Sequence, residues 1–144
     1  MPIMPKSPPE SAVQRLRIAY PQLFVSDVER SAAFFKDKLG FVIDYLYGQP
    51  PFYGLVSRDG VGLNLRHMDA PVIDPTLREQ EVLLSAAIVM DGIEELFHEY
   101  QSRRVEFAQA LSQQPWGTRD FVVRDPDGNL ICFASRTIEH EEFT

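Results

Sequence analysis

The sequence has three histidines and one cysteine that could ligate a metal ion or act as nucleophiles. They are His67, His98, His140 and Cys132. No two histidines stand at i and i+4 on a predicted helix or alternate on one strand, the spacings that bring two imidazoles to one metal ion. Cys132 lies between two large apolar residues, which favours a packed thiol over a reactive one. These groups therefore predict neither a metal site nor a catalytic centre.

Other signatures of catalysis are also missing from the sequence, whereas aromatic side chains suited to binding are present. Those near predicted loops and strand ends are Tyr45, Tyr47, Phe52, Tyr53 and the sole tryptophan, Trp116. Rigid rings with a polar tip are good stacking surfaces for flat ligands. Tyr45 and Tyr47 could equally cover the core, but Trp116 lies between a proline and a glycine, as expected for a loop at a binding surface. Binding is thus better supported than chemistry.

Composition limits the partners that the protein can have. The chain has 144 residues, 44% of them hydrophobic, as expected for one domain with a core. No stretch approaches the ~20 apolar residues of a membrane span, and the first nine residues do not resemble a secretory signal. The net charge of −7 argues against nucleic acid; it is compatible with a cationic ligand or with an ordinary acidic protein. A single cysteine suits a reducing compartment, so we expect a cytoplasmic protein.

The elements that would position the candidate residues begin after a proline-rich segment, residues 1–16, which we expect to be a flexible arm. A strand is predicted over 18–25, and Ser26 to Glu29 has the spacing of a capping box at a helix start. The apolar stripe of that helix is Val28, Ala32, Phe35 and Leu39. Strands over 41–47, 52–57 and 61–66 complete a β-α-β-β-β order.

The second half of the chain repeats this order. Residues 68–80 are interpreted as a linker, followed by a strand over 82–90 and a helix capped by Asp91. Its predicted stripe is Ile93, Leu96, Phe97 and Tyr100. A short strand over 105–108 and a loop over 111–118 precede a hairpin over 121–133, whose turn contains Pro126 and Gly128. The repeat predicts an α+β fold of two βαβββ modules, residues 17–67 and 81–136 within one domain over 17–136, and then an acidic tail, residues 137–144.

Three stretches of the sequence resemble the vicinal-oxygen-chelate superfamily, which includes glyoxalase I, extradiol dioxygenases and bleomycin-resistance proteins. They are Phe24 to Phe41, Trp116 to Phe121 and Arg124 to Leu130. The resemblance implies half-barrel sheets that enclose a concave cavity. It says less about function, since one fold hosts many chemistries.

The positions at which metalloenzymes of this superfamily carry their ligands correspond here to Tyr20, Asn64, Ser85 and Cys132. None of these residues is a histidine, glutamate or aspartate, the side chains that a divalent ion prefers along with thiolates. The resemblance therefore implies a protein without a metal or other cofactor and without catalytic residues.

We accordingly interpret the sequence as a metal-free protein that binds and sequesters a bleomycin-type antibiotic or a related flat cationic ligand. The residues expected to line the site are Tyr20, Phe24, Tyr47, Phe52, Tyr53, Asn64, Ser85, Trp116, Arg119 and Cys132. The resemblance also implies a homodimer, and apolar residues on both faces of the strand predicted over 82–90 would need cover. Two alternatives remain open: an enzyme (lyase, isomerase or dioxygenase) with displaced or absent metal ligands, and a structural or regulatory module with a vestigial groove.

Overall fold

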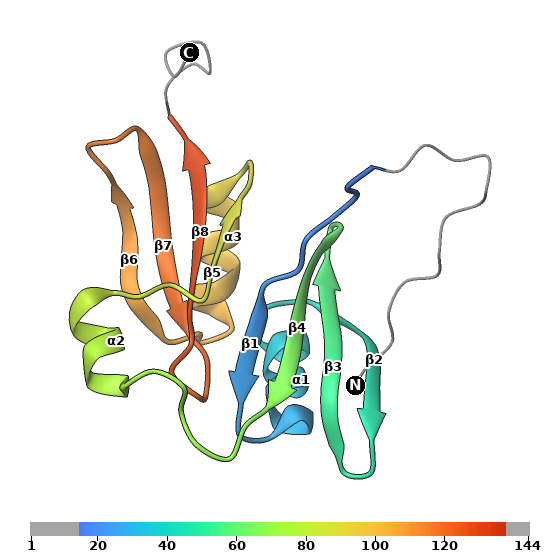
Figure 1. Ribbon diagram of the computed structural model, residues 1–144. Helices are drawn as coiled ribbons and strands as arrows, with labels where there is room; N and C mark the ends of the chain where they lie inside the picture. The colour runs from blue at the N-terminus through green and yellow to red at the C-terminus, as the bar shows by residue number, and fades with distance from the viewer. Residues whose placement is uncertain (1–14, 138–144) are drawn as a thin grey trace.

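The computed structural model of the chain describes residues 15–137 (Figure 1). The expected arm up to residue 14, His140 and the tail from residue 138 lie outside the described residues. Within the described range, no helix combines the length and the apolar character needed to cross a membrane.

The first module forms a four-stranded sheet with one helix. Its elements are β1 (Gln22–Val25), α1 (Val28–Asp37), β2 (Val42–Gly48), β3 (Pro51–Arg58) and β4 (Val61–His67). The strand order is β1-β4-β3-β2. β1 is parallel to β4, whereas the β4–β3 and β3–β2 pairs are antiparallel.

The second module has the same topology. Its elements are α2 (Pro75–Glu81), β5 (Ala86–Val89), α3 (Ile93–Ser102), β6 (Phe107–Gln113), β7 (Thr118–Arg124) and β8 (Leu130–Arg136). The strand order is β5-β8-β7-β6, with β5 parallel to β8. The predicted α+β fold of two βαβββ modules is therefore confirmed.

Helix α1 forms where the apolar stripe was predicted, because Val28, Ala32 and Phe35 are all buried against the sheet. Its N-cap is Asp27, whose carboxylate accepts a hydrogen bond from the backbone N–H of Arg30 at 3.0 Å. The predicted cap at Ser26 was wrong by one residue.

Several predicted boundaries in the second module were wrong. Helix α2 begins within the segment interpreted as a linker, and its C-cap, Val82, is in the left-handed region (φ 51°). The chain therefore turns there, and β5 begins only at Ala86. Gly92, not Asp91, is the N-cap of α3 and makes no side-chain cap hydrogen bond. β6 extends to Gln113, into the predicted loop.

In the first module, β1 likewise begins four residues later than predicted, at Gln22. Pro21 immediately precedes it and has no N–H to contribute to a sheet. Tyr20 consequently lies outside the strand, although it remains next to the sheet.

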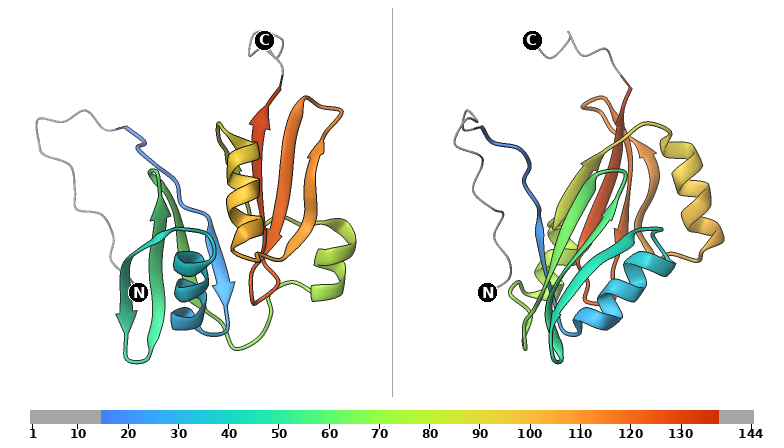
Figure 2. Two further views of the ribbon diagram at one scale, coloured as in Figure 1. Left: turned by 180° about the vertical axis from the view of Figure 1, so that it is seen from behind. Right: turned by 90° about the vertical axis from the view of Figure 1, so that its right-hand side faces the viewer.

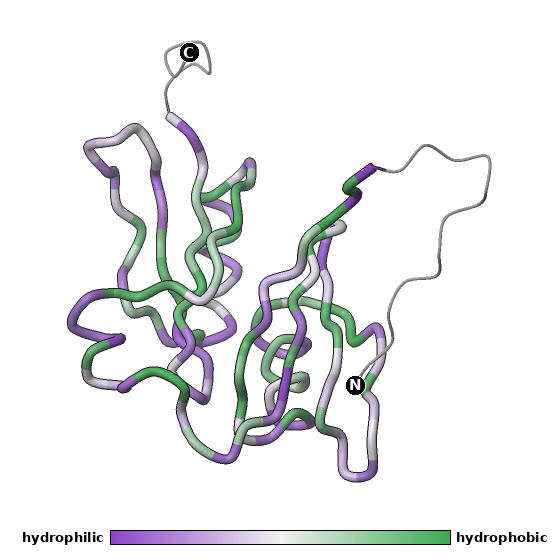
Figure 3. Tube along the Cα trace, viewed as in Figure 1, coloured by the Kyte–Doolittle hydropathy of each residue, from purple (hydrophilic) through white to green (hydrophobic). Residues whose placement is uncertain are grey.

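The hairpin of β7 and β8 is formed as predicted. The backbone N–H of Gly128 (φ 81°) donates to the carbonyl of Asp125 at 3.0 Å, closing the turn. The Asp125 carboxylate also accepts from the backbone N–H groups of Asp127 (2.9 Å) and Asn129 (2.7 Å). Hydrophilic residues colour this turn purple in Figure 3, between two strands with hydrophobic stretches.

Helices α1 and α3 cover the same side of the two sheets, and the opposite faces carry neither of them (Figure 2). One hydrophobic core contains residues of both modules. Across the module boundary, the Tyr100 hydroxyl of α3 donates to the carbonyl of Leu39 at 2.8 Å. Lys38 Nζ donates to the Arg103 carbonyl at 2.7 Å. The shared core and these hydrogen bonds therefore hold the two sheets together on the side of α1 and α3. The two opposite faces are called the open faces below.

Candidate functional site

The open face of the first sheet carries several phenol and amide groups. In the strand register Tyr47 pairs with Tyr53, and Asn64 pairs with both Leu55 and Gln22, so these side chains share a face. Gln22 Nε2 lies 3.4 Å from the Tyr53 hydroxyl. This face offers hydrogen-bonding groups on rigid rings, as the sequence predicted for a binding surface.

Tyr20 joins this open face although it precedes β1. A Cβ atom placed on Gly62 would lie 2.6 Å from the Tyr20 ring, so the ring rests on the bare backbone of Gly62. The pKa of Tyr45 is raised, first by burial and then by the nearby Tyr53 and Tyr20. The structure thus brings Tyr20, Tyr45 and Tyr53 together.

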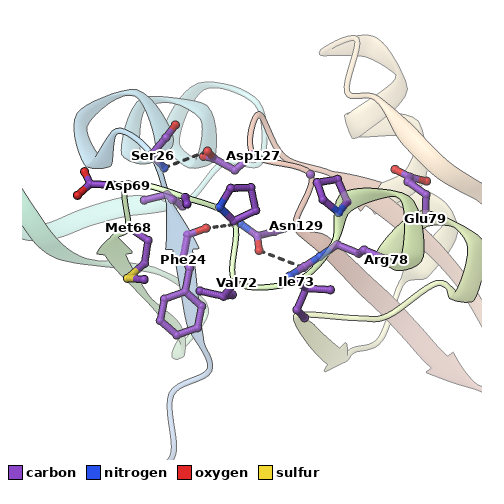
Figure 4. Close-up of a pocket in the computed structure, with 15 residues that line it drawn as sticks. Phe24, Ser26, Met68, Asp69, Val72, Ile73, Arg78, Glu79, Asp127 and Asn129 are labelled. Atoms are coloured by element: carbon purple, nitrogen blue, oxygen red, sulfur yellow. Dashed lines mark hydrogen bonds between the residues drawn. The ribbon is translucent and has the colours of Figure 1, made fainter.

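Phe52 and Phe24 lie at the margins of this group. Phe52 precedes Tyr53 at the irregular start of β3, and its ring meets that of Tyr47 edge-on at 5.5 Å. Phe24 lies on the open face of β1 and lines a cavity of about 150 Å³ between the modules, shown in Figure 4.

The open face of the second sheet has smaller and less polar side chains. Val122, Leu130 and Cys132 form a buried cluster against which Ala108 and Ala134 pack. Burial raises the pKa of the Cys132 thiol to about 11, so it is protonated at neutral pH. The side chain is 7% exposed, which confirms that it is packed.

Helix α2 lies over one end of this second open face. Arg78, a buried residue of α2, donates to the Ser85 hydroxyl and, at 3.1 Å, to the Asn129 amide oxygen. Arg124 of β7 is paired with Glu79 of α2, with Nη2 to Oε2 at 3.1 Å. Ser85 is therefore occupied by a guanidinium group instead of facing an open cavity.

Arg78 was missed by the sequence analysis because α2 was not predicted. A signal was present: Asp74 accepts from the Thr76 N–H at 2.9 Å, and Pro75 occupies the first turn. An Asp followed by Pro is a recognised helix start.

Asn129 connects α2 to the first module. Its amide nitrogen donates to the Asp125 carboxylate at 2.9 Å. It also donates to the Phe24 carbonyl at 3.1 Å (Figure 4). Burial raises the pKa of the Asp125 carboxyl to about 6, against the lowering effect of the hydrogen bonds from Asn129. These contacts link Arg78, the hairpin turn and β1.

Trp116 lies where the sequence predicted an accessible ring. It is 62% exposed and lines a cavity of about 290 Å³ with Val89, Thr118, Ala134 and Arg136. Arg119, three residues later, is not part of this cavity, because its guanidinium pairs with Glu94 of α3 at 3.1 Å.

The four positions implied as metal ligands do not fit a divalent ion. Tyr20 and Asn64 belong to the first open face, whereas Ser85 and Cys132 belong to the second module. They comprise a phenol, an amide, a hydroxyl and a protonated thiol, and Ser85 already accepts from the positively charged Arg78. The Arg78 guanidinium at the Ser85 hydroxyl would repel a metal ion.

The two described histidines have no metal-site arrangement. The His67 ring nitrogens lie 2.9 Å from the Ser26 carbonyl and 2.8 Å from Asp69. His98 is in the middle of α3. Across residues 15–137, no three His, Cys, Asp or Glu side chains are grouped so that they could hold a metal ion.

Comparison with known proteins identifies the class to which this fold and these surfaces belong. The chain belongs to the Glyoxalase/Bleomycin resistance protein/Dioxygenase superfamily, whose sequence profile matches residues 17–133. It is 31% identical to the bleomycin resistance protein of Geobacillus stearothermophilus, over 78% of this chain and 92% of the relative.

Solved structures lead to the same superfamily. The bleomycin-binding protein of Streptomyces verticillus complexed with copper(II)-bleomycin is 25% identical, with a TM-score of 0.65 over 84% of this chain and 97% of that one. The bleomycin resistance determinant encoded on transposon Tn5 shares the fold, at 20% identity and a TM-score of 0.69 over 85% and 100% of the two chains.

Proposed function

We propose that the protein binds and sequesters a bleomycin-type antibiotic without altering it chemically. The observation that carries the proposal is Trp116, an exposed ring beside a cavity whose other apolar residues are Val89 and Ala134. A flat aromatic portion of a ligand would stack on such a surface. The relative that is 31% identical is itself a bleomycin resistance protein.

The residues proposed to contact the ligand come from both open faces. On the first they are Tyr20, Tyr47, Tyr53 and Asn64, with Phe24 and Phe52 at its margins, and on the second it is Trp116. Ser85, which already accepts from Arg78, and the packed Cys132 are not proposed as direct contacts. The net charge of −7 would attract a cationic ligand. Arg119 is better explained by its ion pair with Glu94.

The proposed active form is a homodimer. Exposed apolar or aromatic side chains on the open faces include Tyr47 (47%), Trp116 (62%) and Val89 (67%). Facing surfaces of two chains would cover them and would form a groove for the ligand. We place this activity in the cytoplasm, because a single free cysteine, Cys132, suits a reducing compartment.

The test uses Trp116 as the reporter, since it is the only tryptophan. Metal-free bleomycin and copper(II)-bleomycin are titrated while fluorescence is followed, and calorimetry gives the stoichiometry per chain. We expect a saturable change with both forms. Because copper can quench fluorescence directly, the metal-free drug is the decisive arm.

Two further measurements complete this test. Light scattering should give the mass of two chains, and mass spectrometry should recover the drug unchanged after prolonged incubation. Absence of both a saturable signal and heat would refute drug binding, whereas recovery of a modified drug would favour the enzyme alternative.

A further inference from the structure

The repeat creates two equivalent junctions between the modules. The turn joining β7 and β8 meets the end of β1, and the turn joining β3 and β4 meets the end of β5. These junctions lie at opposite ends of the boundary between the sheets (Figure 1). Each pairs the hairpin turn of one module with the first strand of the other.

The first junction is closed by side-chain hydrogen bonds. The backbone N–H of Ser26 donates to the Asp127 carboxylate at 2.9 Å. Asn129 donates to the carbonyl of Phe24 at 3.1 Å. Two turn residues are therefore bonded to the backbone of β1 and the residue after it.

The second junction lacks the corresponding groups. The repeat places Asp59 where the first junction has Asp127, and Val61 where it has Asn129. A valine side chain cannot donate a hydrogen bond. Asp91, which precedes the N-cap of α3 as Ser26 precedes that of α1, makes no hydrogen bond to this turn within the described range. This junction contains a cavity of about 330 Å³, compared with about 150 Å³ at the first.

The walls of the larger cavity are mainly apolar. They include Phe41, Val61, Ile88, Leu96 and Phe133. Tyr100 also lines it, but its hydroxyl is bonded to the Leu39 carbonyl, so the ring is what it contributes to the wall. The space exceeds the ~150 Å³ at which an apolar cavity can hold a benzene ring.

The charged groups at this cavity leave an excess of carboxylate. Arg58 makes a two-point contact with Glu99, at 2.9 and 3.0 Å, and Arg103 pairs with the same carboxylate at 3.3 Å. Asp59 and Asp91 also line the cavity. The charged residues of the lining are thus Arg58, Asp59 and Asp91, and Arg58 is already paired with Glu99 outside the lining. No hydrogen bond or ion pair of Asp91 is found within the described range.

We propose that this cavity, which shares only Val89 with the Trp116 cavity, is a second binding site for a small primary amine carrying one apolar ring. The ring would occupy the space between Phe41, Ile88 and Phe133. The ammonium group would lie at the rim beside Asp59 and Asp91. A cation is favoured there because the rim carboxylates outnumber the guanidinium groups.

The experiment uses benzylamine and its neutral counterpart, benzyl alcohol, with isotopically labelled full-length protein. Amide chemical shifts should change saturably at Val61, Ile88 and Met90 with benzylamine, and more weakly with benzyl alcohol. Asp91→Asn should weaken benzylamine binding by up to about fivefold, the range of an exposed ion pair. Glu81→Gln, an equal charge change at the end of α2, should have no effect.

A cavity-filling variant, Val61→Phe, should abolish the shifts while bleomycin still changes Trp116 fluorescence. Absence of saturable shifts would overturn the proposal, as would equal affinity for benzyl alcohol or unchanged binding in folded Val61→Phe. If that variant fails to fold, the set of amides whose chemical shifts change and the affinity of the Asp91→Asn variant still test the proposal. Adding saturating benzylamine before the bleomycin titration separates the two proposals, because each readout can fail while the other succeeds.

Discussion

The two open faces differ although the backbones beneath them have the same topology. The first carries Tyr20, Tyr53 and Asn64, and neither α1 nor α3 covers it. The second buries Val122 and Cys132 in a small apolar cluster, and α2 lies over one end of it. A repeated fold therefore fixes where strands and helices lie, while side chains and one added helix give each face its own chemistry.

The largest expected effect comes from removing the link that holds α2 on the second face. Arg78→Met would leave Asn129 and Ser85 without their buried donor. Hydrogen bonds to a charged group are worth ~1.5–3 kcal/mol each, so the free energy of unfolding should fall by about 3 kcal/mol. Urea denaturation measures it. Arg17→Ala, in an exposed segment, should change it by less than ~0.5 kcal/mol; a similarly small loss for Arg78→Met would mean that α2 is not anchored by this residue.

The next effect is a pH dependence of the free energy of unfolding, which we expect from Asp125 in the β7–β8 turn but not from Asp59 in the β3–β4 turn. In the folded protein the Asp125 pKa is about 6, above its ordinary 3.8, so the fold binds this proton more tightly than the unfolded chain does. Its contribution to stability is present below pH 4 and is lost as pH rises through 6, at about 1.4 kcal/mol per pKa unit, or ~3 kcal/mol in total.

Unfolding free energies measured from pH 4 to 7 check this sign. Asp125→Asn should remove that part of the pH dependence, whereas Asp59→Asn, in the exposed turn of the first module, should keep it. An unchanged pH profile in Asp125→Asn would show that burial does not raise this pKa.

The smallest effect concerns which open face binds the ligand. Trp116→Ala should weaken bleomycin binding about tenfold, or ~1.4 kcal/mol, with little loss of stability because the ring is 62% exposed. Tyr47→Ala tests the first face, and calorimetry replaces fluorescence in both variants. If both faces contact one drug molecule, the effects should be non-additive in the double variant; a loss confined to one variant would assign the site to one face.

Features that depend on local sequence were predicted well. The stripes of α1 and α3 and the turn at Gly128 are set by periodicity and backbone preference, which a single sequence displays. Exposure of Trp116 followed from its proline and glycine neighbours.

Features that depend on tertiary contacts were not predicted. Leu83 and Leu84 extend an apolar run and were assigned to a strand, but the left-handed Val82 ends α2 just before them. The link from Arg78 to Asn129 joins residues 51 positions apart, which no local pattern reveals. The orientation of Arg119 could have been predicted. Side chains alternate along a strand, so Arg119 lies on the same face as the buried Phe121, the face covered by α3.

Gly62 shows how a missing side chain constrains the evolution of its neighbour. The position has no positive φ, so its backbone would tolerate other residues, but the Tyr20 ring occupies the space of a side chain. Gly60, two residues earlier, has the opposite constraint: open space and a φ of +83°. Two glycines in one hairpin are thus selected for different reasons. A side chain at position 62 therefore fits only where the ring at position 20 is removed or displaced.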